Sequence, residues 1–403
     1  MKYLELEKLY YKRKDIREEY KKRFNDYSTV KTNLYISPLI RGEKSKNRYE
    51  LFLVPIPKLL TLQNEIIENS KKILKISEQI SNFAIQSCIL DLAGKEIIQT
   101  NEIEGVHSTK KEIYDEINFQ KKSKDSHIIS SYINLLKENY LELDDFKDFK
   151  KLYENLFDQE ILEKEGNAID GRYFRKYPVF IYNNEDKKIH AGINSEEQIE
   201  LHISNLIEFM SNKEIIPLLK AAITHYFLEY IHPFYDGNGR FGRYIYSMYL
   251  SRKYDIFTGI SLSYAIKMNQ KKYLNSFLQV GKEKNYGEIT FFVISMLEII
   301  KDGQESIMEL LEDRKTIYTF MRDKIKEMNL SEVEEDILIK ISEMYLFSKN
   351  IAIKHNDLCD ILEISSYKLK QNIEKLIEKK LIKKVRKTPT VYGLGEKLEE
   401  LID

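Results

Sequence analysis

The fold and chemistry of this 403-residue chain are decided by one stretch: His232-Pro233-Phe234-Tyr235-Asp236-Gly237-Asn238-Gly239-Arg240-Phe241-Gly242-Arg243. The preceding segment, 217–231, has helical periodicity, and Pro233 predicts that this helix ends at or before His232. A second apolar-periodic run starts near Phe241. The stretch is therefore predicted to be a loop that joins two helices and ends at a helix N-terminus.

A loop of this kind is suited to binding an anion. A helix N-terminus offers free backbone N–H groups and the positive end of the helix dipole. Gly237 and Gly239 flank Asn238 and let the backbone approach a ligand closely. Arg240 and Arg243 add two forked guanidinium groups that match phosphate. Together these residues predict a cradle for a polyphosphate.

Two further side chains of the stretch can supply chemistry. His232 can act as a base near neutral pH, and Asp236 can hold a divalent cation. The segment 237–242 also matches the dinucleotide fingerprint G-x-G-x-x-G, but that pattern requires a preceding strand, and here a helix and His-Pro precede it. The sequence contains no P-loop motif, so neither common nucleotide-binding fold is predicted.

The same stretch resembles the signature of the Fic (filamentation-induced-by-cAMP) family, H-x-F-x-[DE]-G-N-G-R-x-x-R, at every defined position. The resemblance implies transfer of AMP from ATP to a hydroxyl side chain of a target protein. The Fic relative that phosphorylates its target has a lysine where this chain has Gly239, which favours nucleotidyl transfer. The resemblance extends over roughly residues 55–300.

The resemblance also implies a role for each residue of the motif. His232 is the general base, Asp236 holds Mg²⁺, and Asn238 orients the α-phosphate. Nucleotide binding falls to a set of five residues: Gly237, Asn238, Gly239, Arg240 and Arg243. Phe234 is expected to anchor the loop in the core rather than to touch the ligand.

A second short motif points to inhibition. On a helix, Thr100 and Glu104 lie on one face, and Gly105 can end that helix. Alone, Glu104 is most simply a surface carboxylate before a helix cap. The segment matches the inhibitory motif of the Fic family, [ST]-x-x-x-E-[GN], and the resemblance implies a pair between Glu104 and Arg243. A carboxylate there competes with a phosphate for the same donors.

Composition limits the remaining options. Lys+Arg and Asp+Glu both number 64, so no strong basic field for nucleic acid is predicted. Two distant cysteines, Cys88 and Cys359, suggest neither a disulfide framework nor a zinc site. The N-terminus resembles no signal peptide, and no run reaches the roughly twenty apolar residues of a membrane span. These features predict a cytoplasmic, mainly α-helical protein without membrane contact.

Along the chain, residues 1–30 predict one charged helix, and 50–56 a short extended segment. Residues 141–151 are poorly patterned between predicted helices. The strongest strand pattern before the C-terminus is a hairpin, 179–190, with a turn at 183–186. In Fic proteins such a hairpin, the flap, pairs with an extended segment of the target, so the resemblance implies that a target protein docks here.

Residues 331–403 have the pattern of a winged helix. A helix-turn-helix pair around 363–365 is followed by a small hairpin whose tip is 387–389. Its lysines could contact phosphates, but Glu374 and Glu378 lie among them. Protein docking or dimerisation is therefore favoured over DNA. A homodimer is also compatible with the family resemblance.

The sequence thus predicts a Fic helical core with a β-hairpin flap and a C-terminal winged helix-turn-helix domain. The predicted domains are an N-terminal helical region (1–125) carrying the inhibitory motif, the catalytic core (126–300), a linker helix (301–330) and the winged helix (331–403). The predicted function is a protein adenylyltransferase autoinhibited by Glu104. Alternatives are removal of AMP or another phosphate transfer at the same site and, from another class, a DNA-binding regulator that senses nucleotide.

Overall fold

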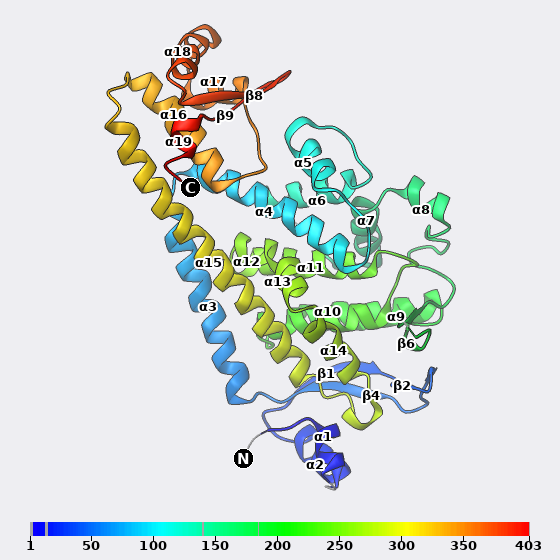
Figure 1. Ribbon diagram of the computed structural model, residues 1–403. Coiled ribbons are helices and arrows are strands. Elements are labelled where there is room, and N and C mark those ends of the chain that lie inside the picture. The colour runs from blue at the N-terminus through cyan, green and yellow to red at the C-terminus, as the bar shows by residue number, and fades with distance from the viewer. Residues whose placement is uncertain (1–2, 13–14, 139–140, 184, 403) are drawn as a thin grey trace. The chain divides into compact units, whose positions relative to one another are not determined.

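The computed structural model describes residues 3–12, 15–138, 141–183 and 185–402. Over these ranges the chain is mainly helical, as predicted (Figure 1). Its internal contacts divide it into two compact units. The first comprises Met1–Ser70, Glu96–Ser108 and Lys124–Gln304, and the second comprises Lys71–Lys95, Thr109–Ser123 and Glu305–Asp403. The four-domain division expected from the sequence stays a prediction.

The N-terminal segment is not the single helix expected over residues 1–30. It forms α1 (Leu6–Tyr11) and α2 (Ile16–Phe24), and residues 1–2 and 13–14 lie outside the described ranges. A new helix starts at Ile16 because Asp15 caps it: its carboxylate accepts hydrogen bonds from the backbone N–H groups of Arg17 and Glu18 at 3.0 and 3.3 Å.

A strand pair that the sequence analysis missed follows α2. β1 (Val30–Ile36) pairs antiparallel with β4 (Tyr49–Leu53), the segment for which only an extended lead-in was expected. Leu34 and Ile36 are buried at alternate positions of β1, which is the strand period. Between them lies a small hairpin of β2 (Leu39–Ile40) and β3 (Glu43–Lys44).

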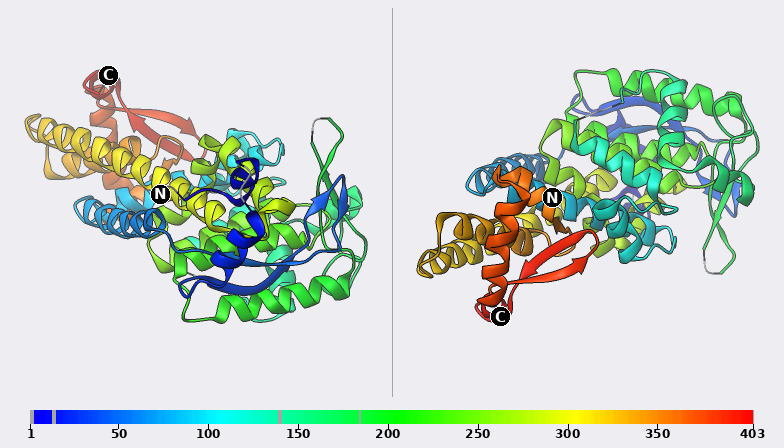
Figure 2. Two further views of the ribbon diagram at one scale, coloured as in Figure 1. Left: turned by 90° about the horizontal axis from the view of Figure 1, so that it is seen from below. Right: turned by 90° about the horizontal axis from the view of Figure 1, so that it is seen from above.

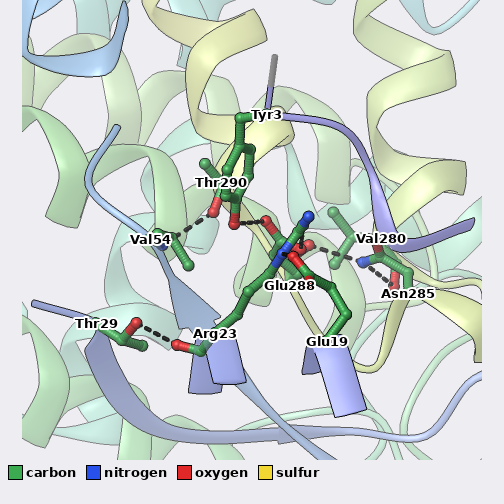
Figure 3. A network of polar contacts seen from close by, with 9 residues as sticks. All are labelled: Tyr3, Glu19, Arg23, Thr29, Val54, Val280, Asn285, Glu288 and Thr290. Carbon is green, nitrogen blue, oxygen red and sulfur yellow. Dashed lines mark hydrogen bonds and ion pairs between the residues drawn. The ribbon is translucent and has the colours of Figure 1, made fainter. Parts of the chain in front are cut away.

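A buried polar network ties this N-terminal segment to the rest of its unit (Figure 3). The Glu288 carboxylate is fully buried; Arg23 Nη1 lies 2.9 Å from Oε2, and the Tyr3 hydroxyl donates to Oε1 at 2.7 Å. Thr290, two residues on, accepts a hydrogen bond at its hydroxyl from the Val54 backbone N–H at 2.9 Å. The network thus joins residues more than 230 positions apart in the sequence.

Helices α3 (Pro57–Ser77) and α4 (Asn82–Ile103) are long and continuous, and the inhibitory motif lies at the end of α4. Four shorter helices follow: α5 (Lys110–Phe119), α6 (Ser126–Leu136), α7 (Phe146–Leu156) and α8 (Gln159–Glu165). α7 takes up half of the stretch 141–151 that was expected to be irregular. Asp145 and Asp148 form a capping box that starts α7, and Phe149, Leu152 and Tyr153 provide its buried face.

The centre of the first unit is three helices that pack side by side: α9 (Glu196–Ser211), α10 (Pro217–Ile231) and α11 (Asn238–Lys253). α10 begins with Pro217 at a favourable position and is buried along nearly its whole length. Around it lie α12 (Ile256–Ile260), α13 (Leu262–Met268), α14 (Gln270–Val280) and the 3₁₀ turn η1 (Glu283–Asn285).

The predicted hairpin forms from β5 (Phe180–Tyr182) and β6 (Lys188–Ala191), paired antiparallel. Figure 2 shows this hairpin standing out from the helices of its unit. Asn184, in the turn predicted at 183–186, lies outside the described residues.

The linker helix predicted at 301–330 is not a separate element. α15 is one continuous helix, Thr290–Lys326, that includes the segment expected to close the core. Ile307 and Leu311, and then Met321 and Ile325, are buried at four-residue spacing. An apolar stripe at this spacing packs against neighbouring structure, so the helix is not a solvated connector.

The C-terminal segment begins with α16 (Glu332–Phe347), and β7 (Ile353–Lys354) leads into α17 (His355–Leu362) and α18 (Ser366–Glu378). β8 (Ile382–Lys387) and β9 (Thr390–Leu394) form the hairpin, and α19 (Glu396–Glu399) ends the chain. The strand order in this sheet is β7-β9-β8. The element order agrees with the expected pattern, and the winged-helix classification stays a prediction. Among the described residues, no helix has the length and apolarity to cross a membrane.

Candidate active site

The motif loop connects α10 to α11, and its backbone needs two special conformations. α10 ends at His232, which has a left-handed φ of 54°, because Pro233 cannot continue the helix. Gly237 has φ 73°, and a Cβ there would lie 2.8 Å from the Phe157 ring. Gly237 therefore serves both the turn and the close packing beneath it.

Asn238 braces this loop with its side chain. Its Oδ1 accepts from the Phe234 backbone N–H at 2.9 Å, and its Nδ2 donates to the Phe234 carbonyl at 2.8 Å. Phe234 is fully buried and stacks on Tyr153 with ring centroids 3.7 Å apart. Both hydrogen bonds brace the loop, and the expectation that Asn238 orients the α-phosphate stays a prediction.

Arg175 is a second brace, which the sequence analysis did not assign. It is completely buried, and its Nε donates to the His232 carbonyl at 2.8 Å, while Nη1 donates to the Tyr177 carbonyl. Burial lowers its pKa to about 10. Its backbone N–H donates to the Pro233 carbonyl at 3.2 Å. Arg175 therefore fixes the carbonyl groups around His232.

His232 has the geometry of a neutral general base. Its Nδ1 lies 3.2 Å from the Glu229 carbonyl, so Nδ1 carries the proton and Nε2 presents a lone pair. Burial lowers its pKa to about 4, which keeps the imidazole neutral at physiological pH. The ring of His190, from β6, lies 5.7 Å away between centroids.

The anion cradle forms at the first turn of α11. Gly239 lies at its centre: a Cβ there would come within 2.8 Å of Glu104 Cδ and 3.0 Å of Arg243 Nη1. Arg240 lies beside it, with Nη2 3.1 Å from Asp236 Oδ2 and the guanidinium 4.7 Å from the Phe157 ring centre. Its Nε is buried and has no hydrogen-bond partner among the described residues. The cradle thus holds donor capacity that an anion can use.

Glu104 lies in this cradle. Its Oε1 is 2.8 Å from Arg243 Nη1, and Thr100 completes the set, with its hydroxyl accepting from Arg243 Nε at 2.9 Å and its carbonyl from Nη2 at 3.0 Å. Arg243 is 1% exposed, whereas the Glu104 side chain is 36% exposed. Burial alone would raise the pKa of Glu104, but Arg243 beside it holds that pKa below its usual value. The pair is therefore fully charged at neutral pH.

Two further buried carboxyl groups lie near this pair, and no sequence motif marks either of them. Glu96, which lies on α4 two turns before the position of Glu104, accepts from the Ser263 backbone N–H at 2.8 Å, and burial raises its pKa to about 7. Glu229, from α10, has its pKa raised to about 8, first by burial and then by Glu104. Glu96, Thr100 and Glu104 are spaced four residues apart, so they share one face of α4.

His225 and Tyr273 form a buried pair beneath the cradle. His225 Nε2 lies 2.8 Å from the Tyr273 hydroxyl, and burial lowers the His225 pKa to about 3. His225 is thus packed and hydrogen-bonded. Tyr273 is buried as well, and its hydroxyl is used in this contact.

The flap strand β5 is open on one side. In the hairpin, Ile181 pairs with His190, so their side chains share the face on which His190 approaches His232. Phe180, Ile181 and Tyr182 are all exposed. The other strand, β6, is flanked by the β2–β3 hairpin, where Lys44 Nζ donates to the Gly192 carbonyl at 2.8 Å. An extended segment can add to β5.

Comparison with known proteins matches this geometry to a family. Residues 140–250 match the sequence model of the Fic/DOC family. The chain therefore carries a Fic domain, which includes the motif loop, the flap and helices α9 to α11.

Two known proteins extend the comparison. A Fic family protein from Desulfovibrio desulfuricans has a similar fold, with a TM-score of 0.52 and 18% identity over 85% of this chain and 97% of its own. A protein from Nematostella vectensis named "Protein adenylyltransferase Fic" is 26% identical over 143 residues, which is 35% of this chain. The match spans only 30% of that relative's length, so its activity as a whole protein enters here only as a proposal.

Proposed function

We propose that this protein is an adenylyltransferase that moves AMP from ATP to a hydroxyl side chain of a target protein, and that Glu104 inhibits it. The observation that carries the proposal is the position of the Glu104 carboxylate. It lies over Gly239 and 2.8 Å from Arg243 Nη1, in a cradle that also contains Arg240, near a histidine whose Nδ1 contacts the Glu229 carbonyl. A carboxylate held there occupies the place of a nucleotide phosphate.

The transfer step follows from His232. Nε2 accepts the proton of the target's Ser, Thr or Tyr hydroxyl as that oxygen attacks the α-phosphorus of ATP. A new P–O bond forms to the target, the bond to the bridging oxygen breaks, and pyrophosphate leaves. The hydrogen bond from Nδ1 to the Glu229 carbonyl keeps the ring in the required tautomer.

The N-terminal end of α11 and the two arginines would bind the negatively charged phosphates. Backbone N–H groups in the first turn of α11 have no helical partners and point at the cradle. Arg240 supplies a free Nε, and Arg243 supplies the Nη1 that Glu104 now uses. An ATP whose γ-phosphate engages Arg243 must displace Glu104, which is how the inhibition would act.

Asp236 is the residue that would hold Mg²⁺. Its side chain is 46% exposed at the mouth of the cradle, with one oxygen used by Arg240. Among the described residues there is no cluster of three metal-binding side chains. A single carboxylate fits Mg²⁺ nonetheless, since this ion is held by one or two carboxylates, water and substrate phosphates. When bound, the ion would offset charge on the leaving pyrophosphate.

The target would dock on the flap. An extended segment that adds to β5 makes main-chain hydrogen bonds along the strand, which fixes the position of its hydroxyl relative to His232. The exposed side chains of Phe180 and Tyr182 would then contact residues beside the modified one.

The test uses Glu104→Gly as the active background and compares it with Glu104→Gly/His232→Ala. Both are incubated with labelled ATP and Mg²⁺, and self-modification is followed by intact mass. Loss of the general base is expected to slow the gain of one AMP mass by roughly 10²–10⁴-fold. Near-equal rates would refute the role of His232, and a gain of phosphate instead of AMP would refute nucleotidyl transfer.

A further inference from the structure

The charges of the C-terminal segment are segregated, although the chain as a whole is neutral. Between residues 366 and 387, which cover α18 and β8, nine side chains are basic and only two are acidic. The balanced net charge of the whole chain argued against a nucleic-acid partner. Because the charges of this segment are not balanced, their local arrangement is the better guide to its partner.

Ion pairs divide these basic residues into two groups. The first group has acidic partners: Lys379 lies 3.4 Å from Glu334, Lys380 3.9 Å from Glu396, and Lys383 2.6 Å from Glu399. The second group consists of five lysines without an ion-pair partner among the described residues: Lys368, Lys370, Lys375, Lys384 and Lys387. All five are exposed. The ninth basic residue, Arg386, is half-buried, and its guanidinium lies 3.9 Å from the Phe119 ring centre. Three of the basic side chains are thus neutralised, and the five exposed lysines keep their positive charge.

The unpaired lysines come from both α18 and β8, and these two elements pack against each other. His355 joins α18 to the hairpin: its Nδ1 lies 2.9 Å from the Tyr392 hydroxyl, and its Nε2 lies 2.8 Å from the Ser366 hydroxyl at the start of α18. The pKa of His355 is lowered, first by burial and then by the charges of Lys370 and Lys384. The exposed lysines of the helix and of the hairpin therefore belong to one connected piece of structure.

The exposed start of α18 has side chains suited to reading a groove. Tyr367 is 72% exposed, and Gln371 Nε2 donates to its hydroxyl at 2.7 Å. Ser365 caps the helix, with its hydroxyl accepting from the Lys368 backbone N–H at 3.2 Å. The two acidic residues, Glu374 and Glu378, lie in the C-terminal half of the helix. The N-terminal half is therefore the positive and hydrogen-bonding part.

We infer that this segment binds duplex DNA, with α18 in the major groove and the β8–β9 hairpin on the adjacent backbone. The major groove of B-DNA is wide enough for a helix, and in helix-turn-helix proteins the second helix enters it by its N-terminal residues. Figure 2 shows the hairpin extending from the helices of this segment, as a backbone contact requires. The deep, narrow major groove of duplex RNA does not admit a helix.

The experiment measures binding of the full chain to a labelled 20-base-pair DNA duplex by fluorescence anisotropy at several salt concentrations. Five phosphate contacts predict a slope of about −4.5 in log K against log salt, or a loss of roughly 500-fold between 50 and 200 mM. Lys370→Ala/Lys384→Ala should flatten the slope by about 2 and weaken binding on the order of 50-fold at 0.1 M salt.

The matched control is Lys379→Ala/Lys383→Ala, which removes two positive charges from the paired group. It should keep the slope of the unmodified chain. Equal weakening by both double variants would overturn the inference, because binding would then follow net charge alone. Absence of binding at 50 mM salt would overturn it, as would equal binding to duplex RNA or tighter binding to phosphatidylserine vesicles. Self-modification of the Glu104→Gly chain is a separate readout of the Fic domain.

Discussion

Two buried arginines of this molecule form ion pairs with glutamates, and the two pairs are built differently. Arg23 and Glu288 are both buried, and the second carboxylate oxygen of Glu288 is taken by Tyr3 (Figure 3). Arg243 is even more deeply buried than Arg23, at 1% against 6% exposed, but its partner Glu104 keeps 36% of its side-chain surface exposed. Each arginine also has other acceptors: Glu19 for Arg23, and Thr100 for Arg243.

The pKa directions of the two carboxyl groups separate the pairs further. Burial dominates at Glu288 and raises its pKa despite Arg23. Burial acts in the same direction at Glu104 and is the largest single influence, but the charge and hydrogen bond of Arg243, together with the charges of Arg240 and His232, outweigh it, and the pKa is lowered. The pair of Arg23 and Glu288, in which both side chains are buried, stabilises the fold. The Glu104 carboxylate is partly exposed, so another anion can replace it beside Arg243.

The largest effect is expected at the buried pair of Arg23 and Glu288. Arg23→Met leaves Glu288 charged and buried without its partner, which should lower the free energy of unfolding by about 3–5 kcal/mol. Chemical denaturation monitored by circular dichroism measures the loss. Arg23→Met/Glu288→Leu removes both charges and should recover most of it. A loss below about 1 kcal/mol in the single variant would mean that the pair does not hold the N-terminal segment.

At the pair of Glu104 and Arg243, removal of one charged partner should increase activity. Glu104→Gly removes one charge-assisted hydrogen bond to Arg243, worth roughly 1.5–3 kcal/mol, so AMP transfer should rise about 10- to 150-fold. The variant should also be stabilised by ATP more than the unmodified chain is, since an anion replaces the lost partner. Thermal unfolding with and without ATP measures this. If ATP stabilises both proteins equally, Glu104 does not compete with the nucleotide.

A smaller effect is expected at Thr100. Thr100→Val keeps the shape and the backbone carbonyl but removes the hydroxyl that accepts from Arg243 Nε. The arrangement in which Glu104 and Thr100 hold Arg243 should lose about 1 kcal/mol of stability. This loss should raise the transfer rate about 5-fold. Thr100→Ser keeps the hydroxyl and is the matched control. An unchanged rate in both variants would assign the whole inhibition to Glu104.

The smallest effects concern pH. The raised pKa of Glu288 means that its contribution to stability is fully present below its ordinary pKa and is lost as pH rises through the raised value. The free energy of unfolding of Glu288→Gln should therefore increase relative to that of the unmodified chain as pH rises above about 4.5, by at most about 1.4 kcal/mol per pH unit. The lowered pKa of Glu104 predicts the opposite: its ion pair persists above the ordinary pKa and weakens only as pH falls below it.

This second half of the pH prediction is measured as a ratio of rates. Between pH 5.5 and 8, the AMP-transfer rate of Glu104→Gly divided by that of the unmodified chain should stay constant within about 2-fold, since Glu104 does not titrate there. A ratio that changes steeply across this range would show that another group, with Glu229 as the nearest candidate, controls the arrangement in which Glu104 holds Arg243.

The sequence predicted what depends on short, local patterns. Pro233 and the glycines specify a loop between two helices, and the strand patterns on either side of the turn specify the flap hairpin. The fit of Thr100 and Glu104 to a known motif pointed to Arg243, 139 or more positions away, and the structure brings the three together.

What the sequence did not predict depends on tertiary contacts. Nothing in the sequence around Arg175 distinguishes it from other loop arginines. Its contact with the His232 carbonyl arises only in the folded structure. The two hydrogen bonds between Asn238 and Phe234 were not predicted, because nothing in the sequence around these residues reveals them. β1 was missed because its pairing partner, β4, lies across a second small hairpin.

The open edge of β5 has a consequence for the protein alone in solution. An unpaired strand edge with apolar side chains can pair with another copy of itself, which leads to aggregation. Here the exposed edge is only three residues long, and the β2–β3 hairpin flanks the neighbouring strand β6. Such a short edge gives two copies few main-chain hydrogen bonds to share, whereas the target that we propose would be held by its side chains as well. The shortness of β5 thus limits pairing between copies of the chain.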